Sequence, residues 1–226
     1  MNVSMHAIRG FRMRRQHLIE RAPAGTMLEA VEAVHGIQAQ VNAHAIFAIA
    51  QRVDKLNVSE IDRALWTDQT LLKTWAMRGT VHWLPASEEP LFRSGLIPLR
   101  GPWLDRWFVR EIESAADRQL LIDVVLDVLA DGPLPRSEIA ARAVPRIGDW
   151  AEPWLTDGWG GAYHTMCNYG LVVFGPTVNN APTFARRDTY AHLPPIEPSS
   201  EAAFELIRRY LRSFGPATVQ DATYWL

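Results

Sequence analysis

The spacing of hydrophobic residues is helical up to residue 66 and then changes to a strand pattern. Apolar positions about one turn apart predict short helices over residues 12–22, 26–35, 42–53 and 58–66. The next stretch, LLKTWAMRGTVHWL (71–84), is rich in β-branched and aromatic residues and is interrupted by Arg78-Gly79. This pattern predicts two strands joined by a tight turn. Short helices followed by one hairpin are the order of a winged helix-turn-helix.

Polar residues near two of these helices predict where they begin. Thr26 is followed three residues later by Glu29, which is the spacing of a capping box. Ser59 is the expected cap of the helix over residues 58–66. Both helices therefore have a start signal in the sequence.

The same order of elements recurs in the second half of the chain. Residues 120–143 predict a helix, a Gly-Pro turn and a second helix, and residues 159–170 predict a third helix that ends at Gly170. Residues 171–175 and 183–188 predict two strands around a loop that contains Asn179 and Asn180. These elements would form a second set of helices with its own hairpin.

A third copy is expected to begin near the end of the chain. The segment over residues 128–140 aligns with residues 210–223, and its Gly132-Pro133 then meets Gly215-Pro216. A repeat at this distance favours tandem domains over one mixed fold. The chain stops within this predicted helix, so we expect the third copy to be incomplete.

Together these patterns predict a mainly α chain with small β-hairpins. We expect tandem winged helix-turn-helix motifs, with a first module over residues 1–115, a second over 116–197 and a truncated third over 198–226.

Composition and charge limit the class of protein. The formal net charge is −2 over 226 residues, yet the first 25 residues are basic, which favours a local anionic partner or a solvated helix face. The single cysteine, Cys167, excludes an internal disulfide framework and a cysteine-based zinc site. The N-terminus lacks the apolar region of a signal peptide, and no apolar run is long enough to span a bilayer. We predict a cytoplasmic, nucleoid-associated protein without membrane contact.

A winged helix commonly binds DNA, and phosphate contacts require arginine, lysine and backbone N–H groups. The candidates are basic residues of the N-terminal segment and of the two predicted hairpins: Arg12, Arg14, Arg15, Lys73, Arg78, Arg186 and Arg187. Each one alone is equally consistent with an ordinary exposed side chain.

Familiar enzyme motifs are missing from the sequence. It contains no Gly-rich phosphate loop, no H-E-x-x-H and no G-x-S-x-G, and its histidines are not paired at metal-ligand spacing. We therefore predict no metal and no other cofactor.

Two glutamines, Gln38 and Gln40, stand between predicted helices in the stretch GIQAQ. On a continuous helix they would point about 200° apart and could not act together. In an extended segment both amides could face one cavity. Spacing alone leaves open whether they act together or only satisfy backbone groups and water.

Four stretches of the chain resemble one family. RMRRQHL, GIQAQVNA, LLKTWAMRGTVHWLPA and FGPAT are together similar to the AlkZ-like family of DNA glycosylases. The resemblance extends over nearly the whole chain and is densest over residues 12–86, where TWAMRGTVH is the most specific stretch.

This resemblance implies an activity and a fold. Members excise alkylated purines such as N7-alkylguanine, and some unhook interstrand crosslinks. Gln38-Ala39-Gln40 matches the Gln, apolar residue, Gln form of the family's catalytic motif, and three winged-helix motifs are expected to line a concave DNA channel. The implied partner is double-stranded DNA with alkylated or crosslinked purines, bound by a monomer.

Two other functional classes fit parts of the sequence. A non-catalytic winged-helix DNA-binding protein, such as a transcriptional regulator, would share the fold and the basic residues, although such regulators commonly bind as symmetric dimers. A scaffold whose winged helices bind protein is compatible with the small net charge.

Overall fold

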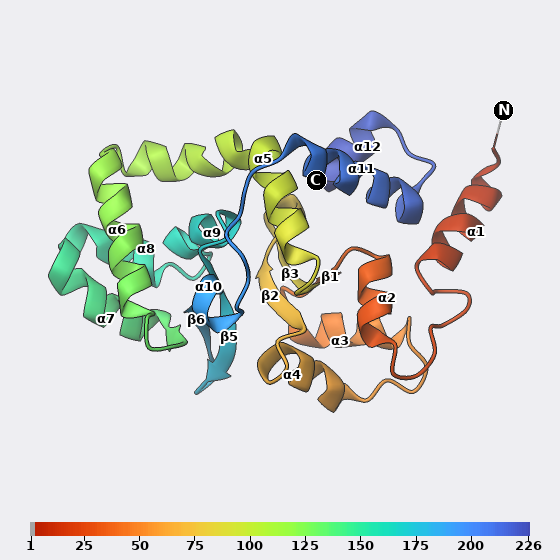
Figure 1. Ribbon diagram of the computed structural model, residues 1–226, viewed down its shortest axis with the longest axis horizontal. Coiled ribbons are helices and arrows are strands. Elements are labelled where there is room, and N and C mark those ends of the chain that lie inside the picture. Colours follow the sequence, from red (N-terminus) through yellow and green to blue (C-terminus); the bar gives the residue numbers. More distant parts are fainter. Residues whose placement is uncertain (1–2) are drawn as a thin grey trace. The chain divides into compact units, whose positions relative to one another are not determined.

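The computed structural model describes residues 3–226, with the side chains of residues 101–105 left out (Figure 1). The chain divides into two compact units. Unit 1 combines Met1–Leu96 with Pro198–Leu226, and unit 2 is Ile97–Glu197.

Unit 1 contains helices from both ends of the chain and one small sheet. Its elements are, in chain order, α1 (Met5–Arg15), α2 (Met27–Ala33), β1 (Ile37–Gln38), α3 (Asn42–Ala50), α4 (Val58–Trp66), β2 (Leu71–Trp75), the 3₁₀ turn η1 (Met77–Gly79), β3 (Val81–Pro85), the start of α5 (Glu89–Glu111), α11 (Ser200–Phe214) and α12 (Val219–Trp225).

The sheet of unit 1 is antiparallel, with the strand order β1-β3-β2. Strands β2 and β3 are the hairpin that the sequence predicts. Its turn is tight because Arg78 and Gly79 both adopt positive φ angles, 58° and 64°. The register places His82 of β3 directly opposite Gln38 on one side and Thr74 on the other.

Residues of this sheet contribute to two different clusters of buried side chains. Ile37, Leu71 and Trp83 pack with side chains of α2, α3 and α4. Leu84 belongs to a second cluster, which includes side chains of the hairpin turn, α5, α11 and α12, among them Phe92, Leu206, Tyr210 and Trp225. Successive residues of a strand point to opposite faces, so Trp83 and Leu84 contribute to different clusters.

A buried ion pair links α5 to β2. Arg93 Nε lies 2.9 Å from Glu89 Oε1, and both side chains are almost fully buried. Arg93 also donates to Thr74 Oγ1 (3.0 Å) and to the Trp75 carbonyl. The guanidinium is thus matched by acceptors, which a buried charge requires.

One predicted helix boundary and two predicted caps in unit 1 are wrong. The first helix spans Met5–Arg15 instead of residues 12–22, because Ser4 caps it and His17 adopts a positive φ of 56° after it. The Thr26 hydroxyl donates to the Pro23 carbonyl and forms no capping box. The cap of α4 is Asn57, whose side chain accepts from Ser59 N–H.

Unit 2 has its own sheet and helices. After the remainder of α5 it contains α6 (Ala115–Val128), β4 (Leu134–Pro135), α7 (Arg136–Ile147), the 3₁₀ turn η2 (Asp149–Ala151), α8 (Glu152–Thr156), α9 (Gly161–Asn168), β5 (Val172–Val178), β6 (Ala181–Arg186) and α10 (Arg187–Tyr190). The strand order is β4-β6-β5.

The core of unit 2 is aromatic. Tyr163 stacks on Phe184 with ring centroids 4.2 Å apart, and Phe174 lies 4.8 Å from Phe184. The Arg136 guanidinium lies over the same two rings of the stacked pair, 4.9 Å from the Phe184 centroid. Asn179 and Asn180, both at positive φ, form the turn between β5 and β6.

The predicted class, mainly α with small β-hairpins, is confirmed by the described residues. The helix pair and the hairpin that the sequence predicts in the second half are present. The division into modules at residues 115/116 and 197/198 stays a prediction, whereas contacts divide the chain at 96/97 and 197/198. No helix among the described residues is both long and apolar enough to cross a bilayer.

The buried ion pair yields a stability prediction. Glu89→Gln leaves the Arg93 charge buried without its carboxylate, so the free energy of unfolding should fall by about 3 kcal/mol. Urea denaturation measures this loss. The matched control is Asp68→Asn, which breaks an exposed pair with Arg63 and should leave the transition nearly unchanged. Equal effects of the two substitutions would contradict the assigned role of burial.

Candidate active site

The two glutamines lie on the segment that links α2 to α3, residues 34–41, which is called the glutamine segment below. Burial alternates along it: Ile37 and Ala39 are buried, whereas Gln38 and Gln40 are exposed. The segment is extended, since β1 includes Gln38 and the backbone N–H of Ala39 donates to the Val81 carbonyl (2.7 Å). Residues i and i+2 of an extended chain share one face, so both glutamines emerge on the same exposed side.

A glycine brings the segment close to β3. Gly36 has a φ of +98°, and a Cβ atom on it would lie 2.4 Å from Leu84 Cδ2 and 3.1 Å from the Trp83 carbonyl oxygen. A side chain here would strain the backbone and collide with the neighbouring strand. Gly36 therefore allows the chain to turn from α2 into β1 against β3.

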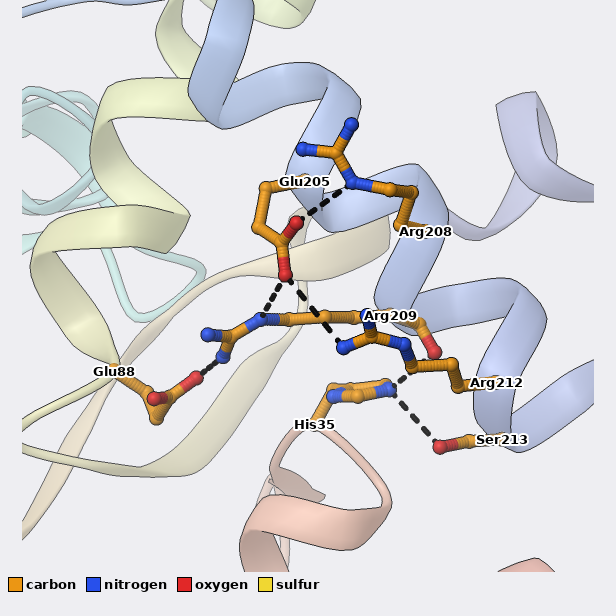
Figure 2. Close-up of polar contacts among 7 residues, drawn as sticks. All are labelled: His35, Glu88, Glu205, Arg208, Arg209, Arg212 and Ser213. Atoms are coloured by element: carbon orange, nitrogen blue, oxygen red, sulfur yellow. Dashed lines mark hydrogen bonds and ion pairs between the residues drawn. The ribbon is translucent and has the colours of Figure 1, made fainter.

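The start of the glutamine segment is fastened to α11 (Figure 2). The Ser213 hydroxyl donates to the Ala33 carbonyl (2.6 Å), and His35 Nε2 donates to the Arg209 carbonyl (2.8 Å). His35 Nε2 also lies 3.1 Å from Ser213 Oγ. A carbonyl oxygen can only accept, so the proton of neutral His35 is on Nε2.

Charged side chains hold α11 in turn to Glu88, the residue before α5 (Figure 2). Arg209 forms ion pairs with Glu88 and with Glu205, the latter at 3.1 Å. Glu205 also accepts from Arg208 Nε at 2.8 Å. Because Arg209 supplies both the carbonyl for His35 and the guanidinium for Glu88, one residue joins the glutamine segment to this ion-pair cluster.

Gln40 and Gln38 differ in what holds them. Gln40 Oε1 accepts from the Val81 N–H at 3.2 Å, so this side chain completes the hydrogen bonding at the end of the β1–β3 ladder. The Gln38 side chain has no hydrogen-bond partner among the described residues. An amide oxygen can accept two hydrogen bonds, so Gln40 retains one acceptor position.

His82 lies beside Gln38 on β3 and is only 1% exposed. Its Nδ1 donates to the Thr80 carbonyl at 2.9 Å. Burial lowers the pKa of His82 to about 4, and the nearby Arg78 and Arg93 charges act in the same direction. The imidazole is thus neutral at pH 7, with its proton on Nδ1 and its lone pair on Nε2.

A hollow of about 520 Å³ lies near the start of the glutamine segment. Its lining is rich in charge and comes from α1, α2, α11 and the residues just after α1 and α2: Arg14, Arg15, His17, Glu29, Glu32, Ala33, His35, Arg209, Arg212 and Ser213. Neither glutamine lines it. Arginine and glutamate both face this space, so it has no single sign of charge.

The predicted DNA contacts of the N-terminal segment have different surroundings. Arg12 Nη2 donates to the Pro216 carbonyl (2.8 Å) and Arg15 Nε donates to the Arg212 carbonyl (2.9 Å), which ties α1 to α11 and the residues after it. Arg14 is exposed and has no hydrogen-bond or ion-pair partner among the described residues. Arg14 therefore offers the most accessible charge of the three.

The remaining predicted contacts belong to the two hairpins. Lys73 Nζ donates to Asn42 Oδ1 (2.8 Å), and burial lowers the pKa of Lys73. Arg78 is half-buried in the hairpin turn, and Arg186 forms an ion pair with Asp188 (2.6 Å). These three side chains keep part of their surface exposed.

Arg187 is the exception among the predicted contacts. It is 2% exposed, and its Nη1 donates to the Pro194 carbonyl at 2.6 Å. Burial leaves this guanidinium no route to a phosphate, so we withdraw Arg187 from the predicted DNA contacts. Its role is to hold the chain after α10 within unit 2.

Two polar residues at this site, His82 and Ser213, cannot be identified from local sequence patterns. His82 is one of the histidines without metal-ligand spacing in the sequence, and its place beside Gln38 follows only from strand pairing. Ser213 reaches Ala33, the residue before the glutamine segment, across a separation of 180 residues. Among the described residues, no cluster of three or more His, Cys, Asp or Glu side chains could hold a metal ion.

Comparison with known proteins identifies one family. The family model described as "DNA glycosylase AlkZ-like" matches residues 31–226. The chain is 32% identical to an "Interstrand DNA cross-link repair glycosylase" of Streptomyces sahachiroi, over the whole chain and 61% of that protein. The solved structure of Streptomyces sahachiroi DNA glycosylase AlkZ superposes with a TM-score of 0.83 at 30% identity, covering 97% of this chain and 60% of that one. The chain thus spans about three fifths of the length of these relatives.

The two buried histidines predict an acid-sensitive fold. Burial lowers the pKa of His35 and of His82 to about 4. In the unfolded chain both histidines would titrate near pH 6.5. As the pH falls from there towards 4, the unfolded chain binds protons that the folded chain does not, which favours unfolding. The free energy of unfolding should fall over this range, by up to about 3 kcal/mol per histidine.

Chemical denaturation at pH 7, 5.5 and 4.5 measures this dependence. His35→Gln can still donate to the Arg209 carbonyl and should reduce the pH dependence. His44→Gln, at an exposed position, is the control and should leave it unchanged. A pH dependence that is the same in wild type and His35→Gln would show that His35 does not contribute.

Proposed function

The chain belongs to the DNA glycosylase AlkZ-like family, and on that premise we propose that it is a DNA glycosylase for N7-alkylated purines. In this proposal it hydrolyses the N-glycosidic bond, and Gln38 and Gln40 position the attacking water. One observation carries the assignment. Both glutamines emerge on the same exposed side of an extended segment whose alternate residues are buried. That arrangement is what joint action of two amides requires.

The chemistry suits amide side chains. N7 alkylation gives the base a positive charge, so the C1′–N9 bond can break with its electron pair going to the base, which leaves as a neutral molecule. The water oxygen bonds to C1′, and the water gives up one proton to solvent. The Gln38 and Gln40 oxygens accept hydrogen bonds from this water, and their partial negative charge favours the cationic sugar in the transition state.

No strong acid or base is needed for this substrate. Positioning the water is worth several kcal/mol by itself. An unmodified purine is a much poorer leaving group, so the same two amides would leave it intact. Selectivity for cationic bases then follows from the weakness of the catalytic groups.

The exposed position of the glutamines also suits a crosslinked base. Such a base is tethered to the opposite strand and cannot be flipped freely into a deep pocket. Gln38 and Gln40 lie at an exposed strand end, and neither lines the hollow beside α11. We therefore include unhooking of interstrand crosslinks in the proposed activity, as in the name of the Streptomyces relative.

DNA binding in this proposal uses the winged-helix modules over residues 1–115, 116–197 and 198–226. Arg12, Arg14, Arg15, Lys73, Arg78 and Arg186 remain the proposed phosphate contacts, of which Arg14 is the most accessible. The protein would act as a monomer on double-stranded DNA within the cytoplasm.

A non-catalytic winged-helix DNA-binding protein, such as a transcriptional regulator, is the alternative. It would use the same basic residues but would release no base. Tight binding to one DNA sequence without base release from alkylated DNA favours this alternative. We prefer the enzyme because the matching family model is that of a DNA glycosylase and both glutamines emerge on one exposed face.

Substitution of Gln38 should separate catalysis from binding. Gln38→Ala removes an exposed side chain without a hydrogen-bond partner among the described residues, so stability and DNA affinity should stay unchanged. Release of 7-methylguanine from methylated duplex DNA, measured by chromatography under single-turnover conditions, should fall by about 100-fold or more. Release at the wild-type rate would refute the role of Gln38.

Gln40 requires a different control because it also serves the fold. Gln40→Ala leaves the buried Val81 N–H without its acceptor and should lower the free energy of unfolding by about 1–2 kcal/mol as well as the rate. Gln40→Glu keeps an oxygen for Val81 and should restore the stability. If Gln40→Ala is as stable as wild type, the Val81 hydrogen bond does not support the segment.

The DNA contacts can be tested through the salt dependence of binding. Arg14→Ala should weaken binding to duplexes of any sequence and reduce the slope of log K against log salt by about one. Arg63→Ala is the control, since Arg63 of α4 is another exposed arginine but is paired with Asp68. Fluorescence anisotropy at several salt concentrations measures both. The same slope for Arg14→Ala and wild type would exclude a phosphate contact at Arg14.

A further inference from the structure

A second hollow of unit 1, called the α12 hollow below, is not used by the proposed function. Its volume of about 450 Å³ is within the range of small-molecule sites. Arg78 of the hairpin turn and Asp221 of α12 line it with one charge of each sign. Four other lining residues are aromatic and come from α11 and α12: Tyr210, Phe214, Tyr224 and Trp225. Aromatic rings with a few charged groups favour a planar, polar ligand.

The aromatic side chains of the α12 hollow differ in exposure. The Tyr210 ring centroid lies 5.4 Å from that of Phe214 and 5.0 Å from that of Trp225. Tyr210 and Trp225 are each only 7% exposed, whereas Tyr224 is 78% exposed. Tyr224 has no hydrogen-bond or ring partner among the described residues. The buried rings therefore form a packed base, and Tyr224 keeps most of its ring free for a ligand.

Both charged groups of the α12 hollow are able to meet a ligand. Arg78 forms no hydrogen bond or ion pair among the described residues. The N–H and the hydroxyl of Thr218 both donate to Asp221 Oδ2 at 2.8 Å, and these bonds lower the pKa of Asp221. The Asp221 carboxylate is thus charged at pH 7. Its other oxygen, Oδ1, has no partner among the described residues.

The α12 hollow is built on the same supports as the glutamine segment. Trp225 packs edge-on against His35, with ring centroids 5.8 Å apart. The turn that carries Arg78 leads directly into Val81, whose N–H donates to Gln40 Oε1 at 3.2 Å. One wall of the hollow thus contacts the start of the glutamine segment, and the other wall continues into the strand that holds its end.

We propose that the α12 hollow binds the alkylated purine of the substrate and recognises its positive charge. This inference rests on the proposed function and adds a binding site for the base. N7 alkylation makes the purine a planar cation, which the faces of tyrosine and tryptophan rings attract. The Asp221 carboxylate attracts the same charge and can accept from the N–H groups of guanine. Arg78 remains available for the phosphate of the same nucleotide.

Recognition of this charge acts on binding and not on bond cleavage. The positive charge of the purine disappears as the C1′–N9 bond breaks, because the electron pair goes to the base. Contacts that favour the cation therefore stabilise the bound substrate more than the transition state. The α12 hollow thus has the opposite kinetic signature to Gln38, whose loss lowers the rate at unchanged affinity.

Mononucleotides test the hollow without any chemistry. At about pH 6, 7-methylguanosine 5′-monophosphate carries a cationic base, and guanosine 5′-monophosphate is its neutral counterpart. Wild type should bind the methylated nucleotide about tenfold more tightly, as measured by NMR titration. Tyr224→Ala should remove most of this preference, and Tyr224→Phe should retain it because the ring remains. Phe204→Ala is the control, since Phe204 is another exposed aromatic residue of α11 but lies outside the hollow.

Release of 7-methylguanine provides a second readout. In Tyr224→Ala the concentration of methylated duplex at half-maximal single-turnover release should rise about tenfold, while the rate at saturation stays within about threefold of wild type. The inference is overturned by equal affinities of wild type for the two nucleotides, by binding of neither, or by an unchanged preference in Tyr224→Ala. The same loss in Phe204→Ala, or a lower saturating rate at unchanged half-saturation in Tyr224→Ala, also overturns it.

Failure of this inference and failure of the proposed function give different results. If wild type prefers the methylated nucleotide but releases no base, the proposed function fails and the hollow is still a site for cationic purines. If wild type releases 7-methylguanine but does not prefer the methylated nucleotide, the inference fails and the proposed function stands.

Discussion

The arrangement of the site depends on one long-range contact, the docking of the turn after α2 onto α11. Ser213 and the Arg209 carbonyl hold Ala33 and His35 by hydrogen bonds, across about 180 residues of sequence. Gly36 then lets the chain pass against β3, and the β1–β3 ladder sets its direction. With both ends of the turn fixed, the next residues have no freedom to continue α2 as a helix. Gln38 and Gln40 emerge on one side for that reason.

Neutral groups dominate the chemistry of this segment. Burial lowers the pKa of both His35 and His82 to about 4, so neither carries charge at pH 7. The exposed groups are two amides, which can orient a water molecule but cannot transfer a proton efficiently. Such a site is suited to a substrate that already has a good leaving group. The weakness of glutamine as a catalyst thus agrees with the cationic purine of the proposed reaction.

Local patterns in the sequence predicted those helices and strands that are determined by residues close together in the chain. The hairpin around Arg78-Gly79, the helix over residues 58–66 and the helix pair in the second half follow from periodicity and turn residues. Helix caps were less predictable. The spacing of Thr26 and Glu29 fits a capping box, but the Thr26 hydroxyl donates to the Pro23 carbonyl instead. Spacing alone allowed Gln38 and Gln40 to lie either on a helix or on an extended segment. Pairing with β3 shows that the segment is extended. The burial of Arg187 and the place of His82 beside Gln38 likewise depend on tertiary contacts that no local pattern contains.

The central claim is that the glutamine segment presents two amides that together hydrolyse an alkylated nucleotide. Release of 7-methylguanine from methylated duplex DNA by the wild-type chain and by Gln38→Ala/Gln40→Ala tests it most directly. We predict release by the wild type, and no release by the double variant at unchanged DNA affinity. Equal release by both proteins, or release by neither, would contradict the claim.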